Sequence, residues 1–169
     1  MPDTRAATEI ARAHSPRGEV TLHRRERDGV EVLELRVNGV FVMDTVETSS
    51  ERALASWALA LVDHPTRVLV GGLGLGYTLA EVLADDRVEI ATCVELEESL
   101  AGWMLDGTVP QGPALLRDPR ARLVIGDVAE VLANAAPATY DLVLLDVDNG
   151  PDHLVHDHNA ALYEPPSSR

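Results

Sequence analysis

The stretch LVGGLGLGYTLAEVL, residues 69–83, joins an apolar run to a helix-like pattern through glycines spaced two apart. Gly72, Gly74 and Gly76 stand where a buried strand would end and a helix would begin. Glycine has no Cβ, so the backbone can turn sharply there and approach a ligand closely. The stretch therefore predicts the first strand–turn–helix unit of a parallel sheet, with a ligand at the turn.

Strand and helix patterns alternate along the rest of the chain. Apolar runs at 88–96, 122–127 and 140–148 predict three more strands, and helices are predicted between them, apart from a loop rich in Gly and Pro over 106–122. Repeated units of this kind form a doubly wound parallel sheet with right-handed crossovers. We therefore expect an α/β fold whose Rossmann-like core spans residues 48–169.

A different pattern precedes this core. Residues 19–47 hold three alternating runs separated by Asp28-Gly29 and Asn38-Gly39. Such dipeptides are the strongest short signal for a two-residue hairpin turn, because both central positions of a type I′ turn need a positive φ. The segment predicts a small antiparallel β-meander.

Two further segments flank this meander. Before it, residues 1–18 are polar and rich in alanine, and they predict a short helix or a flexible N-terminal segment. After it, Thr48 and Glu51 have the capping-box spacing and predict a helix that ends at His64-Pro65. The apolar face of this helix is expected to comprise Ala53, Leu54, Trp57, Ala58, Leu61 and Val62.

The composition bounds the partners and the compartment. The chain has 14 Lys and Arg residues against 28 Asp and Glu, which gives a net charge of −14. No basic tract is long enough to neutralise a row of phosphates, so we expect no nucleic-acid partner. Cys93 is the only cysteine, which excludes an internal disulfide and suits a buried side chain in a cytoplasmic protein. No apolar stretch reaches the roughly 20 residues of a membrane span.

Carboxylates follow the other predicted strands at the point where each strand ends. Glu95 follows the second strand, Asp127 the third, and Asp146 and Asp148 the fourth. In a doubly wound sheet, ligands bind beyond the carboxyl ends of the strands. Glu95 and Asp127 could simply cap the helices that follow them. Together with the other acids and the glycine turn, however, they predict one nucleoside-type site.

The spacing of these groups favours an adenosyl ligand. Glu95 follows Gly76 at close to the ~20 residues expected of an acid that binds ribose hydroxyls, and Asp127 could accept a hydrogen bond from the exocyclic amine of adenine. The glycine spacing is not that of the phosphate-binding loop, and no lysine stands nearby to meet phosphates. An uncharged or cationic adenosyl group, such as that of S-adenosylmethionine, is therefore favoured over a dinucleotide.

Residues 19–163 resemble the spermidine synthase (polyamine aminopropyltransferase) family. The resemblance rests on the order of a meander, a helix and a Rossmann-like core. It also rests on the motifs VGGLGLGYTLAEVL, TCVELEE, DPRARLVIGDVAEVL and YDLVLLDVDNGP.

The resemblance implies a reaction and a set of roles. The donor would be decarboxylated S-adenosylmethionine or S-adenosylmethionine, and the acceptor a small-molecule amine. Asp146 would accept a proton from the attacking amine, with Asp148 and Asn149 at the substrate. A homodimer without a metal is also implied. The donor would be bound by Glu95 at the ribose, Asp127 at the adenine, and Gly72, Gly74 and Gly76 along the methionine-derived tail.

The sequence departs from the family's pattern mainly in the amine-binding half of the site. Leu75 stands where the family carries an aspartate that grips the aminopropyl ammonium, and an apolar side chain cannot satisfy an ammonium. The other departures are Thr48 for a glutamine, Ala53 and Leu54 for an Asp-Glu pair, Trp57 for a tyrosine, and Asp148, one place early, with Asn149 after it.

The C-terminal segment, residues 148–169, is short for such a core. We expect a shortened sheet whose last strand has an unpaired edge unless a partner subunit covers it. Within this segment, His153, His156 and His158 stand among aspartates, and we interpret them as a polar loop at the rim of the site rather than as metal ligands.

Three functions are consistent with these patterns. The leading hypothesis is a spermidine synthase-like transferase that moves an aminopropyl-type group to an amine. The first alternative is a class I S-adenosylmethionine-dependent methyltransferase, which Leu75 favours. The second is a non-catalytic binding or assembly module that retains the fold, which the short C-terminal segment favours.

Overall fold

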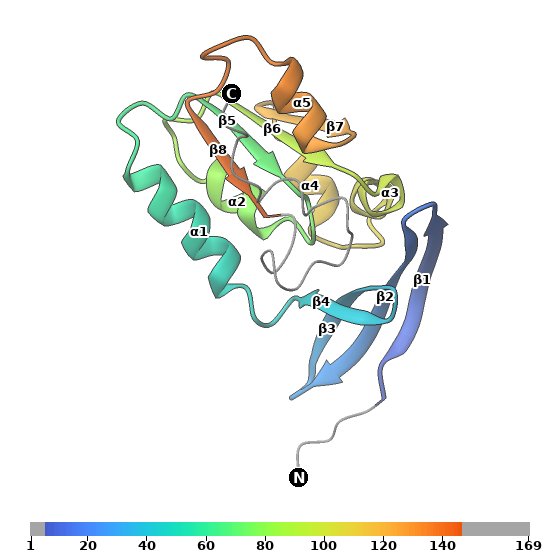
Figure 1. Ribbon diagram of the computed structural model, residues 1–169. Coiled ribbons are helices and arrows are strands. Elements are labelled where there is room, and N and C mark those ends of the chain that lie inside the picture. The colour runs from blue at the N-terminus through green and yellow to red at the C-terminus, as the bar shows by residue number, and fades with distance from the viewer. Residues whose placement is uncertain (1–5, 147–169) are drawn as a thin grey trace.

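The computed structural model describes residues 6–146, which form two four-stranded sheets joined by a helix (Figure 1). The first sheet comprises β1 (Thr8–Ser15), β2 (Gly18–Arg27), β3 (Val30–Val37) and β4 (Val40–Asp44). The second comprises β5 (Arg67–Gly71), β6 (Ile90–Glu95), β7 (Ala121–Ile125) and β8 (Leu142–Leu145). The helices are α1 (Ser49–Ala60), α2 (Tyr77–Leu83), α3 (Glu98–Asp106), α4 (Gly112–Leu116) and α5 (Val128–Asn134).

The antiparallel sheet contains the predicted meander and one additional strand. Its order is β1-β2-β3-β4, and the turns at Asp28-Gly29 and Asn38-Gly39 both have φ of 52° and then 76°, as a type I′ turn requires. The expectation of a helix or a flexible segment over residues 1–18 is wrong for β1. That strand is mostly polar and lies at the edge of the sheet, so its own residues carry no alternating signal. The strand forms because it pairs with β2.

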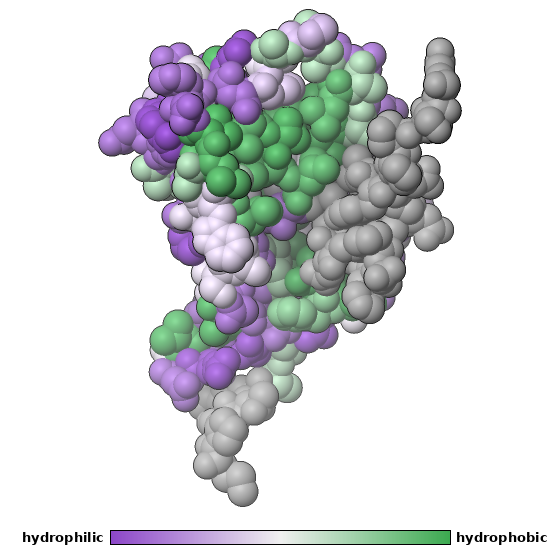
Figure 2. Space-filling view, turned by 60° about the vertical axis from the view of Figure 1, so that its left-hand side comes forward, coloured by the Kyte–Doolittle hydropathy of each residue, from purple (hydrophilic) through white to green (hydrophobic). Residues whose placement is uncertain are grey.

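Helix α1 forms where it was predicted, but it buries a different face. Thr48 is its N-cap residue, yet its side chain makes no capping hydrogen bond. Ala55 and Leu59 are the buried residues, whereas Trp57 is 77% and Leu61 86% exposed. Figure 2 shows apolar side chains gathered on the side of the molecule to which α1 and β8 belong.

The second sheet is parallel, in the order β7-β6-β5-β8, which confirms the Rossmann-like α/β core. Alternate residues of its strands enter two clusters on opposite faces. Val68 and Val70 pack with α2 and the meander, while Leu69 packs with Val128 under α5. Helices therefore cover both faces, which explains why the strands read as continuous apolar runs.

Two details of this sheet bear on the sequence analysis. The segment expected to be a loop over 106–122 contains the short helix α4, whose first residues include a proline. Within residues 6–146, β8 is an edge strand with no partner on its outer side. Among these same residues, none of the helices has the length and apolar content that crossing a membrane requires.

Candidate functional site

The carboxyl ends of the parallel strands form one continuous rim. Backbone hydrogen bonds continue one residue past the ends of the strands: Gly72 N–H donates to Val94 O (2.8 Å), Gly126 N–H to Glu95 O (2.9 Å), and Asp146 N–H to Gly71 O (2.7 Å). The carboxyl ends of β5 and β8 point toward the meander (Figure 1). The rim therefore lies between the two sheets.

Glu95 ends β6, and its carboxylate is buried under the glycine turn. Its Oε1 accepts the N–H of Leu73 at 2.9 Å, and its Oε2 accepts the N–H of Glu97 at 2.8 Å. Burial raises the pKa of Glu95, and the nearby Glu97 adds to this effect, while the backbone N–H groups oppose it. A buried acid fixed by two backbone donors is a preorganised acceptor, because a carboxylate oxygen can accept more than one hydrogen bond.

The glycines of the turn have backbone conformations that L-residues rarely adopt. Gly72, Gly74 and Gly76 have φ of 99°, 52° and 92°. A Cβ at Gly74 would lie 2.6 Å from Met43 Sδ, and one at Gly76 would lie 2.6 Å from a Leu115 methyl carbon. At these two positions, protein side chains occupy the space that the glycines were expected to leave free for a ligand.

Leu75 lies in the same turn but faces the protein core. Its side chain is fully buried within the main hydrophobic cluster, and its carbonyl oxygen accepts a hydrogen bond from the side-chain amide of Gln111 at 3.2 Å. The side chain of Leu75 therefore helps to hold the turn on the core.

Asp127 follows β7 and caps α5. Its Oδ1 accepts the N–H of Ala129 at 2.8 Å, which is the helix-capping role that we weighed against ligand binding. The preceding residue, Gly126, donates to the carbonyl of Glu95, so the two acids come from adjacent strand ends.

Asp146 follows β8 and makes a short hydrogen bond within the protein. The hydroxyl of Thr78, a buried residue in the first turns of α2, donates to Asp146 Oδ2 at 2.6 Å. Burial raises the pKa of Asp146, the Thr78 hydroxyl opposes this, and the charge of Glu51 adds to it. Asp148, Asn149, His153, His156 and His158 lie outside the described residues.

Sequence reasoning missed Thr78, Glu97 and Arg17. Thr78 approaches Asp146 from 68 residues away, and the Arg17 guanidinium meets Glu97 from 80 residues away. No local pattern reports such pairs. The only signal in the sequence was that Glu97 and Thr78 lie within two of the motifs already singled out.

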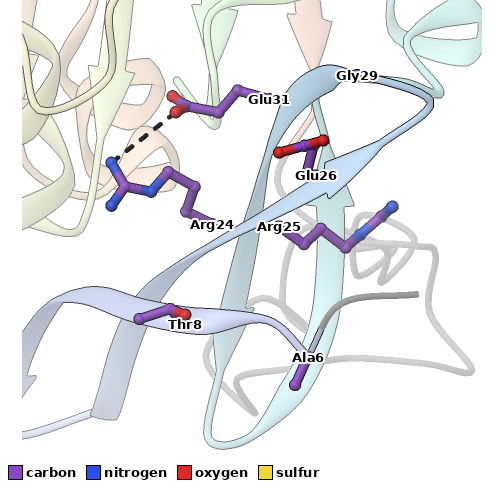
Figure 3. A pocket seen from close by; sticks show the side chains of 7 residues that line it. All are labelled: Ala6, Thr8, Arg24, Arg25, Glu26, Gly29 and Glu31. Carbon is purple, nitrogen blue, oxygen red and sulfur yellow. Dashed lines mark ion pairs between the residues drawn. The ribbon is translucent and has the colours of Figure 1, made fainter. Parts of the chain in front are cut away.

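One cavity reaches this rim at Asp127, and another lies away from the rim on the meander. One, of about 480 Å³, extends from Ile125, Gly126 and Asp127 along α5 to Tyr140. The other, of about 290 Å³, lies on the meander, where Arg24 pairs with Glu31 at 3.8 Å and Arg25 points away from that pair (Figure 3). Arg25 is paired with Glu34 and Asp44, so carboxylates already neutralise the cations of this second cavity.

Comparison with known proteins agrees with the fold. No protein-family model matches the chain. The polyamine aminopropyltransferase of Aeropyrum pernix is 33% identical over 127 residues, which cover 69% of this chain and 40% of that protein. A crystal structure of spermidine synthase in complex with the transition state analogue AdoDATO superposes with a TM-score of 0.76 over 89% of this chain and 50% of that one, at 24% identity. The chain is spermidine synthase-like.

Other relatives of this spermidine synthase-like chain carry a different name. Putrescine N-methyltransferase 4 of Nicotiana tabacum is 32% identical over 88 residues, which cover 52% of this chain and 22% of that protein. The chain thus spans well under half the length of the curated relatives that it matches. The resemblance inferred from the sequence, and the Rossmann-type core that it implied, are both confirmed.

Proposed function

We propose that the chain binds an adenosyl-sulfonium donor and transfers an aminopropyl group from it to an amine. The observation that supports this most strongly is the shared rim, where neighbouring strand ends carry Glu95, Asp127 and Asp146. The names of the relatives, polyamine aminopropyltransferase and spermidine synthase, favour the same reaction.

Donor binding would use the acids of β6 and β7. Glu95, held by two backbone N–H groups, would accept the ribose hydroxyls. Asp127 would accept the adenine amine in addition to its helix cap, because a carboxylate can accept about four hydrogen bonds. Gly72 would line the methionine-derived tail, while Gly74 and Gly76 would shape the turn rather than leave space beside it.

The reaction needs one proton acceptor. The amine nitrogen attacks the carbon next to the sulfonium, the carbon–sulfur bond breaks, and its electron pair stays on sulfur to leave a neutral thioether. The nitrogen then releases a proton, which Asp146 would accept. A pKa raised by burial makes Asp146 a stronger base, and Thr78 fixes its orientation.

Methyl transfer from S-adenosylmethionine is the second candidate. The relatives named putrescine N-methyltransferase favour it. Leu75 does not distinguish the two donors, because its side chain is buried in the core and both donors carry an ammonium. The acids of the rim would serve both reactions, which differ in the donor and in the sulfonium carbon that the amine attacks.

Calorimetry and product mass distinguish these candidates. We would titrate the protein with S-adenosylmethionine, its decarboxylated form and methylthioadenosine, and then incubate each donor with putrescine. Tighter binding of the decarboxylated donor and a product heavier by an aminopropyl group support the first candidate. A methylated product supports the second, and binding of none of the three supports a non-catalytic module.

The assembly and compartment are part of the same proposal. We propose a cytoplasmic homodimer that acts on a small-molecule amine, without nucleic acid or a membrane as a partner. The exposed apolar residues of α1 supply a surface that a second copy could bury. The mass of the protein in solution tests the dimer.

A further inference from the structure

We propose that Arg17, in the turn between β1 and β2, is a positioning residue that holds the turn after β6 and, through it, Glu95. The inference rests on the proposed role of Glu95 in binding the ribose. It assigns a function to the meander, which would be required for the donor site although it carries none of the predicted site residues.

The Arg17 guanidinium binds the β6–α3 turn at two points. Its Nε donates to Glu97 Oε1 at 2.9 Å, and its Nη2 donates to the carbonyl oxygen of Leu96 at 2.9 Å. The side chain of Arg17 is 31% exposed and that of Glu97 only 7%, so the pair is largely shielded from water. Two donors of one planar group fix both the position and the orientation of their partners.

Leu96 and Glu97 are the two residues that follow Glu95. The N–H of Glu97 donates to Glu95 Oε2 at 2.8 Å. Arg17 therefore holds the carbonyl on one side of this N–H and the side chain on the other. If the turn moved, the N–H that orients the carboxylate of Glu95 would move with it.

The turn that carries Arg17 is itself held in place. The hydroxyl of Ser15 accepts the N–H of Arg17 at 3.2 Å and lies 3.4 Å from Glu97 Oε1. Asn38 Oδ1 accepts the N–H of Glu19 at 2.9 Å, and the N–H of Asn38 donates to Glu19 O at 2.7 Å. The meander thus presents Arg17 from a framework of several hydrogen bonds.

The charge of Arg17 suits this position. Glu97 and Glu95 are two buried carboxylates close together, and the charge of Glu97 contributes to the raised pKa of Glu95. A guanidinium on Glu97 offsets part of that repulsion. Without it, a buried negative charge would lose its cationic partner, which is costly.

The test compares Arg17→Ala with Arg24→Ala, a matched control on the same sheet whose ion pair is exposed. The first measurement needs no ligand: amide hydrogen exchange at Glu97 and Leu73, the two donors to Glu95. We expect exchange at both amides to be about tenfold faster in Arg17→Ala and unchanged in Arg24→Ala, because only Arg17→Ala removes the charged hydrogen bonds that hold the turn. Unchanged exchange in Arg17→Ala would overturn the inference.

The second measurement is the preference for a ribose. We compare the affinity for methylthioadenosine with that for its 2′-deoxy analogue. The ratio of the first affinity to the second should fall about tenfold in Arg17→Ala. It should recover in part in Arg17→Lys. A general loss of folding would lower the affinity for both ligands equally and leave the ratio unchanged. If the unmodified protein shows no ribose preference, the role of Glu95 fails. If the unmodified protein prefers the ribose and Arg17→Ala keeps that preference, only the role of Arg17 fails.

Discussion

Replacement of Glu95 by glutamine tests the centre of the proposed site. The change keeps the size of the side chain but puts an amide in place of a carboxylate that accepts N–H groups from Leu73 and Glu97. Two ribose hydroxyls on a carboxylate are worth roughly 3–6 kcal/mol, because hydrogen bonds to charged groups contribute about 1.5–3 kcal/mol each. We therefore expect Glu95→Gln to weaken methylthioadenosine binding by about 10²–10⁴-fold.

The same variant has a stability signature with a defined sign. Burial raises the pKa of Glu95 above its ordinary value of 4.5, so folding disfavours the charged form. Below that ordinary value the group is neutral in both folded and unfolded states. As the pH rises through the raised pKa, the unmodified protein loses stability that Glu95→Gln does not lose. The free energy of unfolding of the unmodified protein, relative to the variant, should therefore fall as the pH rises above about 4.5.

Isothermal calorimetry and urea unfolding at several pH values provide both readouts. Glu98→Gln is the matched control, since Glu98 is exposed in the first turn of α3 and undergoes the same chemical change. The control should bind methylthioadenosine as the unmodified protein does. Equal affinity in Glu95→Gln would refute the ribose assignment, and a stability difference that does not vary with pH would refute the electrostatic argument.

Three further predictions concern the catalytic acid, the glycine turn and the apolar surface. Asp146→Asn should leave methylthioadenosine affinity unchanged and reduce single-turnover product formation by roughly 10²-fold or more; unaltered turnover would exclude Asp146 as the base. Gly76→Ala should lower the free energy of unfolding by more than about 1–3 kcal/mol, because the φ of Gly76 is positive and an added Cβ would clash. Gly39→Ala is the control: its φ is also positive but the space beside it is open, so it should cost about 1 kcal/mol. Urea unfolding measures both. Leu61→Glu should change the free energy of unfolding by under roughly 0.5 kcal/mol and reduce self-association measured by light scattering; unchanged association would exclude this surface from an interface.

The sequence alone determined those features whose causes are local. Asp28-Gly29 and Asn38-Gly39 specify their turns because the required φ values belong to the residues themselves. The glycine turn and the acids at the strand ends could likewise be assigned, because parallel strands that alternate with helices all end at the same edge of the sheet.

Tertiary structure decided what depends on partners distant in the sequence. The strand β1 exists because β2 pairs with it, and α1 buries Ala55 and Leu59 rather than Trp57 because contacts with α2 and β8 select the face. The hydrogen bonds of Thr78 with Asp146 and of Arg17 with Glu97 each join residues almost half the chain apart. A sequence pattern records the preferences of neighbouring residues, whereas such contacts depend on packing, which brings distant residues together only once the chain has folded.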